Sequence, residues 1–131
     1  MTHDLHRLSL EEQSALLAKR GLSSAELVEH HLERCERLNP KLNAFITLDT
    51  AGARAAAQSA DRELAAGRCR GRLHGIPVAH KDLFDTDGVR TTYGSKFFRA
   101  HMPTRDAEVV RRLKTNGAVS LGKLNLHEFA A

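Results

Sequence analysis

Aromatic residues are scarce in this 131-residue sequence: tryptophan is absent, and aromatic residues account for 5% of the chain. Hydrophobic residues make up 41%, but many of them are alanine, so the predicted core is shallow. No apolar run approaches the length of a membrane span, and the polar start Met1-Thr2-His3-Asp4 lacks the apolar region of a signal peptide. These absences predict a cytoplasmic protein with the length of one ordinary domain.

Cysteine is also scarce, and the two cysteines, Cys35 and Cys69, do not make a disulfide framework. Cys35 is predicted to pack on the apolar side of a helix, and Cys69 to lie in a loop. The formal net charge of +4 is spread along the chain, with acids among the bases. The one basic cluster, Arg68-Cys69-Arg70-Gly71-Arg72, contains no aromatic residue that could stack on a base, so it is predicted to be a solvated loop.

Eight histidines raise the question of a metal site. His30 and His31 are adjacent on a predicted helix and point about 100° apart, so one ion cannot easily take both. The pair His127-Glu128 lacks the second histidine that a zinc-protease helix requires. The sequence also contains no Gly-x-Ser-x-Gly nucleophile elbow and no phosphate-binding glycine loop. It therefore predicts neither a bound metal nor a cofactor.

The first part of the chain, about residues 1–40, is predicted to be a helical lead-in. Two capping boxes, Ser9–Glu12 and Ser23–Glu26, predict the starts of two helices, because serine and glutamate there satisfy each other's backbone amides. The first helix is predicted to end near Arg20, and the second near Leu38, before the helix-breaking pair Asn39-Pro40. The second helix carries an apolar stripe at helical spacing, formed by Ala25, Val28, Leu32, Cys35 and Leu38.

The rest of the chain, about residues 41–131, alternates predicted strands and helices. Strands are predicted over 42–48, 76–79 and 118–121. The helices are an alanine-rich one from Thr50 to about Ala66, one opened by Thr104 or Asp106 and capped by Asn116-Gly117, and a first turn at 126–129. Asp87-Gly88 marks a turn. This alternation indicates an α/β layer architecture.

A single lysine, Lys81, follows the apolar run Ile76–Ala79. Pro77 and its neighbours favour an extended backbone, so the run is predicted to be a short buried strand. A lysine at its end lies at the carboxyl edge of a sheet, where open α/β sheets place ligand crevices. Burial there would favour the neutral amine, which can act as a base, although many lysines after a strand are simply solvated. His80 is predicted to point to the opposite face. Asp82 either pairs with Lys81 or stabilises the turn, and the turn role is favoured.

Four ordered motifs from about Leu73 to the end of the chain resemble the amidase signature family, serine amidohydrolases with a Ser–cis-Ser–Lys triad. The motifs are residues 73–86 (LHGIPVAHKDLFDT), 90–96 (RTTYGSK), 103–113 (PTRDAEVVRRL) and 117–130 (GAVSLGKLNLHEFA). The resemblance implies an α/β/α layered fold with a mixed central sheet. It also implies that Lys81 is the catalytic base, that Asp82 and Asn125 are supporting residues, and that Gly122-Lys123 follows a sheet strand.

The family's nucleophilic serine and cis-peptide serine lie further along, in a glycine- and serine-rich stretch that does not occur in this sequence. Ser95 matches a scaffold position of the family. The resemblance therefore implies a truncated, N-terminal part of an amidase domain, which supplies the lysine and lacks both serines. The C-terminal part of that domain would be its partner, and the chain alone is expected to be inactive.

The implied reaction is hydrolysis of a carbon–nitrogen bond in a small amide, in which serine attacks the carbonyl and lysine accepts the proton relayed through the cis-serine. One alternative is the glutamine-hydrolysing component of the tRNA-dependent amidotransferase, which releases ammonia from glutamine and would bring a nucleic-acid partner. The run His127-Glu128-Phe129-Ala130 departs from the Asp-Glu-Phe-Ala usual there and favours the general amidase. An alternative of another class is a non-catalytic α/β module that binds a partner at the Lys81 edge.

Overall fold

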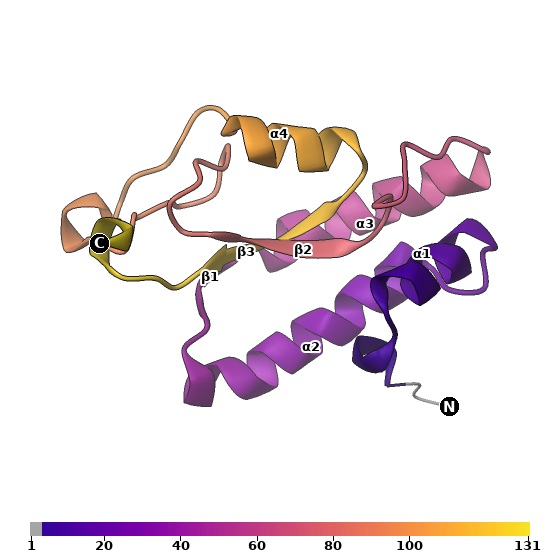
Figure 1. The fold of residues 1–131 in the computed structure, drawn as a ribbon, viewed down its shortest axis with the longest axis horizontal. Helices are drawn as coiled ribbons and strands as arrows, with labels where there is room; N and C mark the ends of the chain where they lie inside the picture. Colours follow the sequence, from indigo (N-terminus) through magenta and orange to yellow (C-terminus); the bar gives the residue numbers. More distant parts are fainter. Residues whose placement is uncertain (1–3) are drawn as a thin grey trace.

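The computed structural model describes residues 4–131 as three layers built around a small sheet (Figure 1). Within those residues no helix combines the length and the apolar character needed to cross a membrane. The elements, in chain order, are α1 (Leu10–Ala18), α2 (Ser24–Leu42), β1 (Phe45–Leu48), α3 (Thr50–Ala65), β2 (Pro77–Lys81), α4 (Glu108–Thr115) and β3 (Val119–Leu124), with short 3-10 helices at Leu5–Arg7, Lys96–Phe98 and Glu128–Ala130.

Both predicted capping boxes are present, and they begin α1 and α2. The predicted end of α2 at Leu38 is wrong, because the helix continues through Pro40 to Leu42. Asn39, whose backbone is disfavoured before a proline, is held by its own side chain: Oδ1 accepts from Phe45 N at 2.8 Å and Nδ2 donates to Phe45 O at 3.1 Å. The helix ends instead at Asn43, which adopts a left-handed conformation (φ 49°).

The start of α4 also lies later than predicted, at Glu108. Asp106 does not cap this helix. Its Oδ1 accepts a hydrogen bond from the backbone N–H of Asp87 at 2.8 Å and another from Lys114 Nζ, also at 2.8 Å. The carboxylate therefore ties the predicted Asp87-Gly88 turn, which is present between bridge residues 86 and 89, to the end of α4.

The sheet has the order β1-β3-β2, so the last strand in the sequence lies in the middle. β3 runs antiparallel to β1 and parallel to β2, which confirms the predicted mixed sheet. In the parallel pair, Pro77 is opposite Val119 and Lys81 is opposite Leu124. The carboxyl ends of β2 and β3 therefore meet at one edge of the sheet, with Lys81 at that edge.

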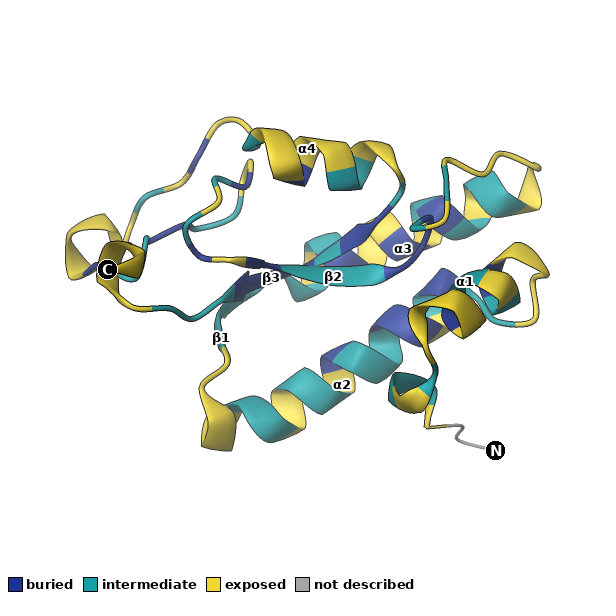
Figure 2. Cartoon of the chain, viewed as in Figure 1, coloured by how far each residue is buried: buried dark blue, intermediate teal, exposed yellow. Residues whose placement is uncertain are grey.

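Helices cover both faces of the sheet. α2 and α3 pack on one face, and Figure 1 shows α4 on the opposite side of the sheet from α2. The side of α3 that faces the core consists of alanines, which confirms a shallow core, and Cys35 and Leu38 of the predicted α2 stripe are only half-buried (Figure 2). The main cluster of buried residues comprises Val28, Leu32, Ala53, Ala57, Val119 and Leu121.

The two residues at the end of β2 face opposite ways, as the period of a strand requires. His80 is buried, with 4% of its surface exposed, whereas Lys81 is exposed. Burial lowers the pKa of His80, and the positive charges of Lys123 and Lys114 lower it further, while Asp106 opposes them. The Nε2 atom of His80 has no hydrogen-bond partner among residues 4–131.

We predict that Gly122→Ala strongly destabilises the fold. Gly122 has a φ of +143°, and a Cβ there would overlap the carbonyl oxygen of Thr47 in β1. Strain and overlap together are expected to lower the free energy of unfolding by more than about 2 kcal/mol, measured by urea denaturation. Gly88→Ala is the matched control: it also has a positive φ (+69°) but open space around it, so a loss of about 1 kcal/mol is expected. Equal losses would contradict the prediction.

We also predict that His80 makes the fold acid-sensitive. Because the folded-state pKa of His80 is lower than the ordinary 6.5, the unfolded chain binds more protons between those two values. The free energy of unfolding should therefore fall as the pH drops below about 6.5. His80→Phe, which titrates no proton, should reduce the stability lost between pH 7 and pH 5 in urea titrations. An unchanged pH dependence in the variant would refute this role.

Candidate functional site

Lys81 lies where the sequence predicts it, at the carboxyl edge of the sheet. Its Nζ donates a hydrogen bond of 2.8 Å to the backbone carbonyl of Asn125, just beyond the end of β3. The expected burial of Lys81 is not met within residues 4–131, where its side chain is exposed. The amine is thus anchored at one point and open to solvent elsewhere, which makes it accessible to a reacting group.

Asn125, the anchor of Lys81, is held from several sides. Its backbone N–H donates to Ala44 O at 2.8 Å, and its side-chain Nδ2 donates to Asn43 O at 3.2 Å. Its Oδ1 accepts from Leu126 N at 3.0 Å. These contacts fix the orientation of the peptide whose carbonyl receives Lys81, which agrees with a supporting role for Asn125.

The buried lysine of this region is Lys123, which the sequence did not single out as a functional residue. Lys123 lies inside β3, so the expectation that Gly122-Lys123 follows the strand is wrong. Its side chain is fully buried, and Nζ donates to Phe84 O at 2.6 Å and to Thr91 Oγ1 at 2.7 Å. Burial lowers the pKa of Lys123, and the nearby Asp82 carboxylate opposes this. The one available signal was a lysine placed between strand-forming apolar residues.

Asp82 is fully buried, and its ion-pair partner is Lys123 at 3.6 Å, not Lys81. Its Oδ2 accepts from the backbone N–H of Thr92 at 3.0 Å and from the Thr92 hydroxyl. Its backbone carbonyl accepts from Tyr93 N at 2.8 Å. Asp82 therefore holds the loop around Thr92 against the end of β2, a wider version of the favoured turn-stabilising role.

Two further polar residues near this edge have structural contacts. Ser95 is buried, and its Oγ donates to Glu128 Oε1 at 2.7 Å and accepts from Phe97 N at 3.3 Å, as a turn serine does. The Tyr93 hydroxyl donates to Asp85 Oδ1 at 2.5 Å, and this bond raises the pKa of Tyr93 to about 12. Tyr93 therefore stays protonated at neutral pH.

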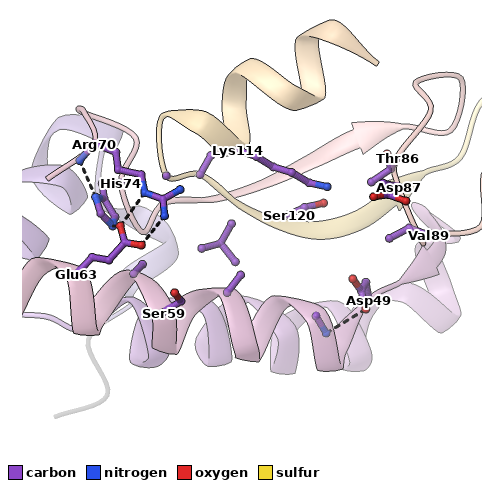
Figure 3. Close-up of a pocket in the computed structure, with 16 residues that line it drawn as sticks. Asp49, Ser59, Glu63, Arg70, His74, Thr86, Asp87, Val89, Lys114 and Ser120 are labelled. Atoms are coloured by element: carbon purple, nitrogen blue, oxygen red, sulfur yellow. Dashed lines mark hydrogen bonds and ion pairs between the residues drawn. The ribbon is translucent and has the colours of Figure 1, made fainter. Parts of the chain in front are cut away.

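A groove of about 340 Å³ lies elsewhere, between α3 and the end of α4 (Figure 3). Figure 3 shows Glu63, Arg70 and His74 gathered at one end of it. Glu63 forms an ion pair with Arg70, and His74 Nδ1 accepts from Arg70 N at 2.8 Å. Burial lowers the pKa of His74 and favours its neutral form. Because these groups satisfy one another and Lys81 does not line the groove, the groove is not the candidate active site.

Among residues 4–131 no group of three or more histidine, cysteine, aspartate or glutamate side chains could hold a metal ion. Both cysteines are free thiols; Cys35 is half-buried and Cys69 is exposed. The chemistry of the candidate site therefore rests on the amine of Lys81 and on the polar groups that surround the two strand ends.

Comparison with known proteins gives the context of this geometry. The chain is similar to a subunit of the Glutamyl-tRNA(Gln) amidotransferase, with 55% identity over 122 residues to the protein of Aromatoleum aromaticum and 50% over 126 residues to that of Methylococcus capsulatus. These alignments cover 93% and 96% of this chain, but 25% and 26% of the relatives. The chain thus spans about a quarter of the length of these curated relatives.

Solved structures show the same partial match. The native peptide amidase from Stenotrophomonas maltophilia superimposes with a TM-score of 0.91 at 36% identity, over 96% of this chain and 26% of that one. A fatty acid amide hydrolase, at 21% identity and a TM-score of 0.87, shares the fold. The family model described as Amidase matches residues 26–131. With its mixed sheet and its ordered motifs, this chain belongs to the amidase family.

Proposed function

We propose that this chain supplies the lysine base of an amide-hydrolysing site whose serines lie outside residues 1–131. The observation that carries the proposal is the position of Lys81: its amine is exposed at the common carboxyl edge of two parallel strands and is held there by the Asn125 carbonyl. In a chain of the amidase family, that position matches the lysine of the Ser–cis-Ser–Lys triad.

The chemistry needs an amine that can take up a proton while staying in place. A neutral lysine has two N–H donors and one lone pair, so one donor can bind the Asn125 carbonyl while the lone pair faces the proton donor. Arginine cannot replace it, because its guanidinium remains protonated. The cis-serine would pass to Lys81 the proton of the attacking serine, and backbone amides would stabilise the oxyanion.

Two substrates compete, and the relatives favour one of them. The curated relatives named for the Glutamyl-tRNA(Gln) amidotransferase are 47–55% identical to this chain, whereas the peptide amidase is 36% identical. His127, which favours a general amidase at the level of sequence, is exposed, and its Nδ1 lies 3.1 Å from Ala131 O. We therefore propose glutamine as the first substrate to test, in an assembly with other subunits, and small amides as the second.

In the full-length protein, Lys81→Ala is predicted to lower kcat for ammonia release by at least about 10³-fold, because it removes the base of a coupled unit. Lys81→Arg should be nearly as damaging, while His80→Ala, on the opposite face, should be milder. Ammonia release would be measured with glutamine and, separately, with acetamide and benzamide. An arginine variant with near-parental kcat would show that Lys81 contributes only charge.

The 131-residue chain by itself is predicted to hydrolyse none of these amides. It contains Lys81 but no Gly-Gly-Ser-Ser-Gly stretch, so general-base chemistry would act without a positioned nucleophile. The purified chain would be assayed for ammonia release beside its Lys81→Ala variant. Turnover that disappears in the variant would require a nucleophile within residues 1–131. A folded chain that binds a partner and remains inactive in every longer form would instead favour the non-catalytic module.

A further inference from the structure

The buried ion pair between Asp82 and Lys123 lies directly behind the proposed base. Among the ion pairs of residues 4–131 it is the one in which both side chains are fully buried. Asp82 follows Lys81 in the chain, and Lys123 precedes Leu124, which is opposite Lys81 in the sheet. The pair therefore joins β2 and β3 one residue away from the Lys81 amine's own backbone.

The backbone at both ends of the Lys81–Asn125 contact is fixed by this pair and its neighbours. Asp82 N donates to Leu124 O at 2.9 Å, which closes the last rung of the parallel ladder. Beyond that rung, Lys81 Nζ reaches the Asn125 carbonyl at 2.8 Å. A change in the separation of the two strand ends would move the amine and its anchor relative to each other.

Each buried charge also holds a second segment of the chain. The Asp82 carboxylate binds the N–H and the hydroxyl of Thr92, and the Lys123 ammonium binds Phe84 O and Thr91 Oγ1. The loop after β2 and the segment at 91–92 thus converge on one pair of opposite charges. Lys123 itself is not placed to act as a base on a substrate, because its side chain is fully buried among these partners.

We propose that Asp82 and Lys123 are positioning residues, which hold Lys81 Nζ in register with its reaction partner; this inference rests on the proposed role of Lys81 as the base. Stability alone gives a weak reason for such a pair, since apolar residues of similar volume often stabilise a fold as well as a buried ion pair does. A base, in contrast, is sensitive to small displacements: an error of about 1 Å can lower the rate about 10²-fold.

The test is a double-mutant cycle in the full-length protein. Asp82→Asn/Lys123→Met removes both charges together, so that no buried charge is left unpaired. We expect kcat to fall about 10²-fold while KM changes less than about 2-fold, because positioning acts on the proton transfer and not on substrate binding. In the Lys81→Ala background the same two changes should cost no further rate, because they act through Lys81. An activated ester substrate keeps the residual rates measurable.

Two controls separate positioning from general loss of stability. Leu17→Ala removes a buried side chain from the cluster of Leu17, Leu27 and Ile76, and should lower the Tm while leaving kcat unchanged in the folded protein. If the double variant does not fold, Asp82→Asn alone serves in the cycle, because asparagine keeps the shape and an acceptor for Thr92.

The outcomes are distinct. An unchanged kcat in the charge-free variant, or an equal loss with and without Lys81, would overturn the positioning role while leaving Lys81 as the base. A Lys81→Ala enzyme with parental kcat would overturn the proposed function and this inference together. A loss of kcat that is absent in the Lys81→Ala background, with KM and the Leu17→Ala control unchanged, would support the inference.

Discussion

The pairing of β3 with a strand on each side is the constraint on which the rest of this structure depends. On one side its parallel ladder with β2 brings two carboxyl ends to the same edge, and on the other its antiparallel ladder with β1 carries Asn43 and Ala44 to the anchor at Asn125. The close approach of Gly122 to Thr47 permits this arrangement, since a side chain at that position would collide with the neighbouring strand. The edge that holds Lys81 is therefore a product of three strands, although a single strand carries the residue.

The helical layers have a different basis. α3 presents alanines to the sheet, and such small side chains let a helix approach closely while contributing little apolar area each. Buried polar groups supply much of the specificity on the other side of the sheet, where Asp82, Lys123, Thr91 and Thr92 replace a conventional apolar cluster. Satisfied polar networks of this kind specify one arrangement of loops, because each alternative leaves a buried donor or acceptor without a partner.

Local signals were sufficient for much of the fold. The capping boxes located the starts of α1 and α2, and the period-two alternation of a strand placed His80 and Lys81 on opposite faces. The features that sequence reasoning missed depend on distant contacts. α2 passes Pro40 because Asn39 bonds to Phe45, and Lys123 is buried because the segments at Phe84 and Thr91 fold over it. Neither partner is within helical or strand spacing of the residue it affects, so no local pattern could reveal it.

The strand order has a consequence for synthesis at the ribosome. The central strand is the last of the three to be made, so β1 and β2 leave the exit tunnel without the partner that each of them requires. Lys81 waits for Asn125, 44 residues later, and Asn43 waits for the same residue, 82 residues later. Pairings across such separations form slowly and leave strand edges uncovered in the meantime. The nascent chain therefore presents two unpaired strands to chaperones until β3 emerges and completes the sheet in one step.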